Sequence, residues 1–295
     1  MFKGLNIIEF SERFPDENAC YKYLAEIKWS KDYICKKCDH TNYCKGSKPY
    51  SRKCTRCKYI ESVTAGTTFH KLKFSIKKAF YIAFMVSTGK KGIASTELSR
   101  KLSLRQKTCW LFKRKMMQVM KSSEKYPLTG QVNVDEFMVG GPEQGKQGRS
   151  KGKRRQVVVA LEIKGQSILR AYARVIENAG TKQLKPFFNA HINNEAEIRT
   201  DKWRGYKPLQ EKYTKLIQEE SNNGKNFKLI HRYIMCFKGW MRGIHHRCKH
   251  LQAYLDEYNY RFNRRSTFEY IFDNLINRMM LGMPVTYNDL KFSGS

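Results

Sequence analysis

Two aspartates that lie far apart in the chain are the residues best suited to chemistry. Asp135 stands inside the alternating segment QVNVDEFMVGG, and Asp201 closes the short segment EIRTD. Carboxylate oxygens are the ligands that Mg²⁺ and Mn²⁺ prefer. Metal ions held about 3.5–4 Å apart can activate a water or a 3′-hydroxyl and stabilise the leaving oxygen of a phosphodiester. If folding brings Asp135 and Asp201 together, the pair predicts a magnesium or manganese site.

A second set of residues has the spacing of a structural metal site. Two Cys-x-x-Cys pairs lie in a short segment, and each pair fits a tight knuckle that points two thiolates at one ion. We expect them to bind one zinc in a zinc ribbon, with His40 and Cys44 as less well-spaced substitutes. The expected zinc ligands are Cys35, Cys38, Cys54 and Cys57. The chain has nine cysteines, an odd number that argues against a disulfide framework.

The charge of the chain indicates its partner. It has 295 residues with 57 Lys and Arg against 26 Asp and Glu, for a formal net charge of +31. So many positive side chains repel one another and destabilise a compact chain unless a polyanion is near, and nucleic acid is the commonest polyanion. An anionic membrane would need a basic amphipathic helix, whereas here the charge is spread along the chain. We therefore expect double-stranded DNA as partner and no membrane.

Residues 70–126 have the pattern of a helical DNA-binding region. The segment SIKKAFYIAFMVSTG predicts one helix, ASTELSRKL a second that Ser95 or Thr96 can cap, and SLRQKTCWLFKRKMMQVMK a third. A short helix, a turn at Ser103 and a longer basic helix outline a helix-turn-helix. A plain three-helix bundle with a basic face is the alternative.

From residue 127 the pattern changes to that of a mixed α/β domain. QVNVDEFMVGG, KRRQVVVALEIK and SILRAYARVI predict three strands, TKQLKPFFNAHI a helix, and EIRTD a fourth strand. This is the order of an RNase H-like domain, in which the ends of the first and fourth strands lie side by side. Here those ends carry Asp135 and Asp201.

Five segments follow from these patterns. We expect an N-terminal helical segment (1–30), a zinc ribbon (31–69), a helix-turn-helix region (70–126), an RNase H-like catalytic domain (127–282) and a C-terminal tail (283–295). The fold class is thus mixed α/β, with a ribbon and helices before the catalytic domain.

The motifs VDEFMVGG, TDKWRGY and IHRYIMCFKGWMRGIHHRCKHLQAYLDEYNYRFNRR resemble insertion-sequence DDE transposases with an N-terminal zinc ribbon, bacterial relatives of Merlin elements. The resemblance covers nearly the whole chain. It implies recognition of terminal inverted repeats, metal-dependent cutting and joining of DNA, and a homo-oligomer on paired ends. It also implies a cytoplasmic, nucleoid-associated bacterial protein, with Asp135 and Asp201 as the first two metal-binding carboxylates.

The position of the third family carboxylate departs from the pattern. Cys236 stands where the family has Glu, or Asn followed two residues later by Lys, and Lys238 matches that Lys. A thiol is a soft ligand that suits Mg²⁺ poorly. The branch uses Asp135, Asp201 and Lys238 with position 236 close by, or another carboxylate completes the site, or this copy is catalytically impaired. The carboxylates considered are Glu136, Glu219, Glu220 and Glu257.

The remaining candidate residues are basic or amide side chains that suit DNA contacts. They lie at the start and middle of the third helix, in a basic loop near residue 150, and on the helix after the fourth strand. They are Arg105, Gln106, Lys107, Lys113, Arg114, Lys151, Lys153, Arg154, Arg155 and Arg242.

The sequence therefore favours a DDE-type transposase. The leading alternative is a zinc-ribbon DNA-binding protein whose transposase-like domain is inactive, which the missing third carboxylate allows. A weaker alternative is a nuclease that cuts without joining ends.

Overall fold

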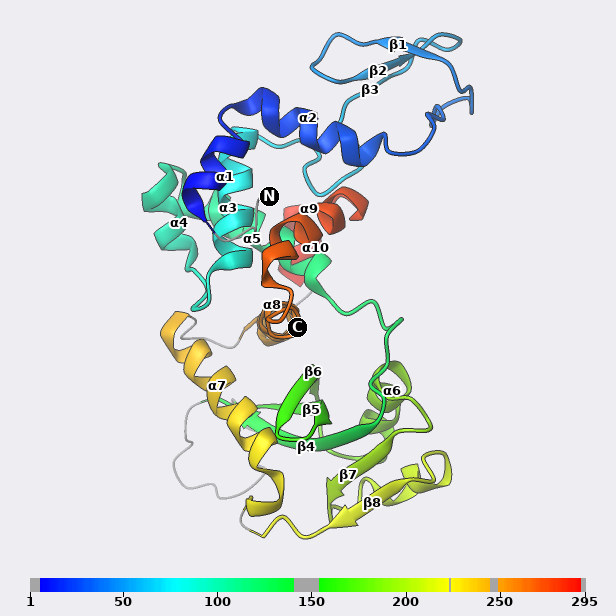
Figure 1. The fold of residues 1–295 in the computed structure, drawn as a ribbon, viewed down its shortest axis with the longest axis vertical. Coiled ribbons are helices and arrows are strands. Elements are labelled where there is room, and N and C mark those ends of the chain that lie inside the picture. The colour runs from blue at the N-terminus through cyan, green and yellow to red at the C-terminus, as the bar shows by residue number, and fades with distance from the viewer. Residues whose placement is uncertain (1–5, 141–153, 223, 245–248, 293–295) are drawn as a thin grey trace. The chain divides into compact units, whose positions relative to one another are not determined.

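The computed structural model describes residues 6–140, 154–222, 224–244 and 249–292. The chain divides into two compact units, shown in Figure 1: the described residues up to 120 together with 267–292 form the first, and those between 121 and 266 form the second. Each unit has its own core, so each is described by itself.

Two capped helices open the first unit. Helix α1 (Ile7–Arg13) begins at Asn6, whose side chain accepts a hydrogen bond from the backbone N–H of Ile8. Helix α2 (Glu17–Lys28) begins at Asp16, which accepts from the N–H of Ala19. Both caps satisfy helix N–H groups that would otherwise have no partner.

A small antiparallel sheet follows. Strands β1 (Tyr43–Lys45), β2 (Arg52–Cys54) and β3 (Ile60–Glu61) pair in chain order. The core of this segment consists of Tyr33, Cys35 and Cys54, with Trp29 and Tyr59 packed against it. So few apolar side chains bury little surface, and a bound metal is the expected source of the missing stability.

Three helices come next, as the sequence predicts. They are α3 (Ile76–Thr88), α4 (Ser95–Leu102) and α5 (Gln106–Met120). The turn between α4 and α5 forms at Ser103, whose φ of 49° is left-handed. The expected cap of α4 is wrong: the helix begins after Ala94, and neither Ser95 nor Thr96 caps it.

The C-terminal helices group with this first compact unit, whereas the boundary expected for the catalytic domain at residue 282 stays a prediction. Helix α9 (Ile271–Leu281) is followed by α10 (Tyr287–Phe292). Phe272 of α9 is fully buried and makes ring contacts of 5.3–6.3 Å between centroids with aromatic residues in or next to α1 and on α3. Its ring partners are Phe10, Phe14, Phe80 and Phe84. These contacts are long-range in sequence, so helical periodicity alone does not reveal them.

The second unit contains a five-stranded mixed sheet (Figure 1). Its strands are β4 (Gln131–Val139), β5 (Arg155–Lys164), β6 (Ser167–Ile176), β7 (Glu197–Asp201) and β8 (Leu216–Glu219). The spatial order is β6-β5-β4-β7-β8. β4, β5 and β6 pair antiparallel, whereas β7 and β8 run parallel to β4. This is the RNase H-like arrangement that the sequence predicts, with β8 as a strand that it missed.

Helices cover the sheet. Helix α6 (Thr181–His191) packs its Leu184, Phe187 and Phe188 into the core beneath β4, β5 and β7. Helices α7 (Lys228–Ile244) and α8 (Leu251–Phe262) contact β4 and β6. In the described part of the chain, 3₁₀ turns also form at Lys207–Glu211, Lys225–Phe227 and Phe268–Tyr270. Among the described residues, no helix is long and apolar enough to cross a bilayer.

The packing of α9 in the first unit gives a testable prediction. Phe272→Ala removes a fully buried ring, and we expect a loss of about 3–5 kcal/mol in the free energy of unfolding of that unit. Leu281→Ala is the matched control, because Leu281 is 83% exposed on the same helix and its change should stay within about 0.5 kcal/mol. Denaturant unfolding measures both variants, and equal stabilities would contradict the assignment of α9 to this core.

Candidate active site and zinc centre

Three carboxylates meet in the second unit. Asp135, Glu136 and Asp201 each offer an oxygen, and these oxygens all lie within 4.8 Å of one another. The expected approach of Asp135 to Asp201 is therefore observed. One detail is corrected: Asp135 lies in the middle of β4, and it is β7 that ends opposite it.

Strand register explains the meeting. β4 and β7 run parallel with Asn133 opposite Arg199, and continuing that register places Asp135 beside Asp201. Beyond that point β4 pairs only with β5. Side chains of successive strand residues point to opposite faces of a sheet. With no strand on that side past Asp201, the neighbours Asp135 and Glu136 can both direct an oxygen into the same place.

The turn after β7 fixes Asp201. Its Oδ1 accepts a hydrogen bond of 3.1 Å from the N–H of Trp203, and the Trp203 indole donates to the carbonyl of Ala179 at 2.7 Å. The side-chain amide of Gln218 donates to the carbonyls of Asp201 and Trp203. The carboxylate therefore sits on a turn with its backbone held at several points.

Gly205 is required by close packing in the same turn. A Cβ at this position would lie 2.3 Å from the carbonyl oxygen of Ala179 and 2.8 Å from the Trp203 indole nitrogen. Any other residue would push the turn that carries Asp201 away from α6. Steric crowding thus explains why the TDKWRGY motif has glycine at this position.

Tyr206 closes this motif beneath the acids. Its side chain is fully buried in the core on the α6 face. Burial, and then the negative charges of Glu136, Asp135 and Asp201, raise the pKa of Tyr206 well above its ordinary value. The phenol is therefore neutral at physiological pH, and it lies close to Glu136 without adding negative charge.

The acid cluster fits a divalent cation. Oxygens around an octahedral Mg²⁺ at about 2.1 Å are separated by roughly 3–4 Å, which agrees with the observed limit of 4.8 Å. Three carboxylates at this separation repel one another strongly unless a cation lies between them. Asp135, Glu136 and Asp201 are the residues that would hold it.

Cys236 does not join this cluster. It is exposed on α7 and lines a separate cavity with residues of β6 and α8. Lys238 lies on another side of α7, with its ammonium 5.7 Å from the centre of the Phe137 ring on β4. Burial, and then the charges of Arg154 and Arg242, lower the pKa of Lys238. The basic group formed by Lys238, Arg154 and Arg242 therefore lies on the α7 side of the sheet, the side to which Asp135 points.

Of the carboxylates considered for the third position, the structure brings only Glu136 into the cluster of described acids. Glu219 pairs with Arg199 at 2.5 Å, and Glu220 pairs with Lys202 at 2.7 Å on the surface. Glu257 is buried on α8 beside Arg261. Sequence alone offers no reason to choose Glu136, because adjacent strand residues normally point apart.

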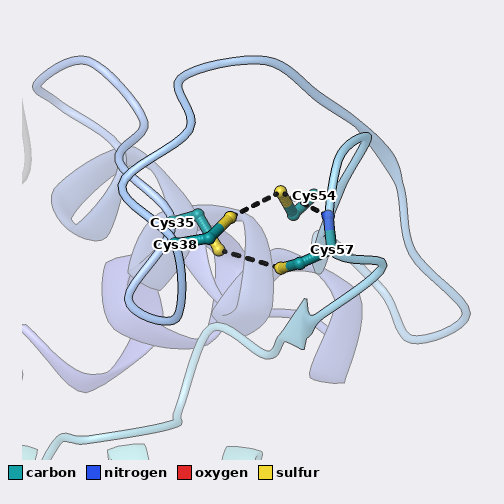
Figure 2. A group of neighbouring side chains, drawn as sticks. All are labelled: Cys35, Cys38, Cys54 and Cys57. Atoms are coloured by element: carbon teal, nitrogen blue, oxygen red, sulfur yellow. Dashed lines mark hydrogen bonds between the residues drawn. The ribbon is translucent and has the colours of Figure 1, made fainter.

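The four paired cysteines also meet, as Figure 2 shows. The sulfurs of Cys35 and Cys57 are 3.5 Å apart, those of Cys38 and Cys54 are 3.7 Å apart, and all four lie within 4.8 Å of one another. Zinc bound tetrahedrally at about 2.3 Å from sulfur separates its ligands by about 3.8 Å. The cluster has the size and the donor set of a structural zinc site. Exposed Cys44 and half-buried His40 lie outside it.

Backbone N–H groups of the knuckles favour the thiolate form of two of these cysteines, Cys35 and Cys54. Burial opposes ionisation of Cys35, but the N–H groups of Lys37 and Cys38 outweigh it and lower its pKa to about 6. In the second knuckle, Cys57 and Arg56 lower the pKa of Cys54 in the same way. Thiolates are the form that binds metal.

Eight of the ten predicted DNA-binding residues fall into three groups. Arg105, Gln106 and Lys107 are exposed at the start of α5, where Gln106 donates to Ser95 and Lys107 lies over the Tyr287 ring. Arg155 and Arg242 are exposed, and Arg154 is half-buried. Lys151 and Lys153 lie outside the described residues.

Lys113 and Arg114 are not placed to meet DNA. Each is only 3% exposed. The Lys113 ammonium donates to the carbonyl of Ile93 at 2.7 Å, so it holds the turn before α4 in place. Their basic character suggested a surface role, but the face of α5 that carries them packs inward. We leave them out of the DNA-binding proposal.

Comparison with known proteins agrees with this geometry. Residues 127–263, a little under half of the chain, match the family model of the ISXO2-like transposase domain. That range begins just before β4, ends just after α8, and contains the three acids. A search of curated proteins finds no match.

The cysteine cluster predicts one zinc per chain. Cys35→Ser should abolish zinc binding and unfold the ribbon, because the small core does not fold without metal. Cys44→Ser is the matched control, since Cys44 is exposed in the same ribbon and lies outside the cluster. Elemental analysis of the purified chain tests this, and folded wild-type protein without zinc would refute it.

Proposed function

The chain carries an ISXO2-like transposase domain over residues 127–263, and from that premise we propose that it binds the terminal inverted repeats of an insertion sequence and catalyses metal-dependent DNA cleavage and strand transfer. The observation that supports this proposal most is the meeting of Asp135, Glu136 and Asp201 at one point of an RNase H-like sheet.

Asp135, Glu136 and Asp201 would hold Mg²⁺ or Mn²⁺. When bound, these ions supply charge neutralisation at a phosphodiester and make water or a 3′-hydroxyl a better nucleophile. The turn that holds Asp201 and the paired strand that holds Asp135 position the ligands before substrate arrives. Pre-positioned charge of this kind accounts for most of the catalysis expected in phosphoryl transfer.

In this proposal Glu136 takes the place of the third family carboxylate, which Cys236 cannot fill. Buried Tyr206 limits the movement of Glu136 from the α6 side. Lys238, with Arg154 and Arg242 nearby, would attract the DNA strand to the α7 side of the acids and offset negative charge on the phosphate. Lys238 therefore positions the strand and does not hold metal.

The remaining parts of the chain would supply DNA binding. Arg105, Gln106 and Lys107, exposed at the start of α5, are placed as the first residues of a recognition helix. Arg155 and Arg242 are placed for backbone contacts. The ribbon, with one zinc, and the helices of the first unit would recognise and hold the transposon ends.

Substitution of either aspartate tests the proposed catalytic site. Asp135→Asn and Asp201→Asn should each lower strand transfer by roughly a hundredfold or more, since each removes a charged ligand. The assay uses DNA that carries the inverted repeats flanking the reading frame, with Mn²⁺. Activity that survives Asp135→Asn would contradict the site. Wild-type protein that binds these repeats but neither cuts nor joins them would favour the inactive DNA-binding alternative.

Glu136 gives a separate prediction with a metal-binding readout. Glu136→Gln should weaken Tb³⁺ binding, followed by its luminescence, by about tenfold or more, because it removes one of three charged ligands. Glu220→Gln is the matched control, since Glu220 forms only a surface pair with Lys202. Equal affinities for the two variants would remove Glu136 from the proposed ligand set.

A further inference from the structure

A cavity of about 240 Å³ lies apart from the acid cluster in the second unit. It is formed where α7, the end of α8 and the start of β6 come together. Its walls consist of Ser167, Ile168, Arg232, Tyr233, Cys236, Tyr258, Phe262 and Arg265. The proposed catalytic chemistry uses none of these residues, although Cys236 stands where the family has a carboxylate or an amide.

The charge of this cavity is entirely positive. Arg232 comes from α7 and Arg265 from the segment after α8, and none of the described residues that line the walls is Asp or Glu. The two guanidinium groups are close enough that, after burial, the charge of Arg232 lowers the pKa of Arg265. Like charges that converge on one space are stabilised when an anion lies between them.

The two arginines differ in how they are held. Arg265 donates to the carbonyls of Phe262 at 2.7 Å, Leu169 at 3.2 Å and Ile168, and it lies 4.2 Å from the centre of the Phe262 ring. These contacts fix its direction and use three of its five N–H groups. Arg232 is exposed, and within the described part of the chain it makes no hydrogen bond or ion pair that would occupy it.

The other walls suit the sugar that follows a phosphate. The rings of Tyr258 and Phe262 lie roughly parallel, 6.1 Å apart, and form an apolar side. The Ser167 hydroxyl, exposed at the start of β6, adds a polar group. A pair of guanidinium groups beside an aromatic wall is a common way to hold a nucleic-acid backbone.

We propose that this cavity binds a backbone phosphate of DNA, with Arg232 and Arg265 donating to the phosphate and Tyr258 lying against the adjacent sugar. The inference rests on the proposed function, because it takes DNA as the partner. It adds a second contact site in the catalytic domain, away from the metal site, that would fix the strand while its reactive part lies at the acids. Cys236 then lies in the wall of this cavity, where a carboxylate would repel the phosphate.

The exposed Cys236 thiol reports directly on occupancy of the cavity. Its reaction rate with a maleimide, followed by peptide mass spectrometry, should fall severalfold when duplex DNA saturates the full chain. Inorganic phosphate is the second arm. Protection by DNA and not by phosphate at the same concentration of phosphate groups supports the proposal, whereas protection by phosphate alone would assign the cavity to a free anion and overturn it.

Arg232→Ala tests the role of the charge. It should abolish protection of Cys236 at saturating DNA and lower the slope of log K against log salt by about one. Lys185→Ala is the matched control, because Lys185 is exposed on α6 and its loss removes the same charge from the other face of the sheet. Cys236 should remain protected in that variant.

Fluorescence anisotropy of total DNA binding separates the two levels of the proposal. DNA that binds the wild-type chain without protecting Cys236 overturns the cavity assignment and leaves the transposase function standing. A chain that binds no DNA overturns both. Protection that persists in Arg232→Ala shows that DNA covers the thiol from elsewhere and also overturns the assignment.

Discussion

Repulsion between carboxylates is the interaction that dominates the acid cluster of the second unit. Two like charges 4 Å apart repel by roughly 4 kcal/mol at an effective dielectric constant of about 20, and here three acidic groups lie within 4.8 Å. The fold resists this repulsion with a parallel pair of strands, β4 and β7, and with a turn held at Gly205 and Trp203. A cation between the three carboxylates would relieve this repulsion.

The same principle applies to the rest of this strongly basic chain. The core of the ribbon is too small for apolar burial alone to stabilise its fold. Its four thiols lie within 4.8 Å of one another and form a site that a metal cation can occupy. The α7 side of the sheet carries Lys238, Arg154 and Arg242 close together, and the cavity near β6 carries Arg232 and Arg265. The two basic groups gather like charges that suit a phosphate, whereas the four thiols of the ribbon offer the donor set of a metal site.

The buried face of α5 shows that positive charge alone does not identify the residues that contact DNA. Lys113 and Arg114 belong to a strongly basic helix, yet both are buried, and the Lys113 ammonium satisfies a backbone carbonyl. A long side chain can bury its methylene groups and still find a partner for its charged end. Net charge therefore indicates the class of partner, but only packing shows which basic residues can reach it.

The sequence by itself determined what depends on local spacing: the two Cys-x-x-Cys knuckles, the helices from α3 to α5, the alternation of β4, β5 and β6, and the aspartates that end up together. Tertiary structure alone decided what depends on partners distant along the chain. Glu136 joins Asp135 because β7 ends beside them, and Cys236 lines a separate cavity because of how α7 packs. Helix α9 groups with the first unit because Phe272 packs against aromatic rings of α1 and α3. Periodicity records which face of an element is apolar, but it carries no information on which surface will cover that face.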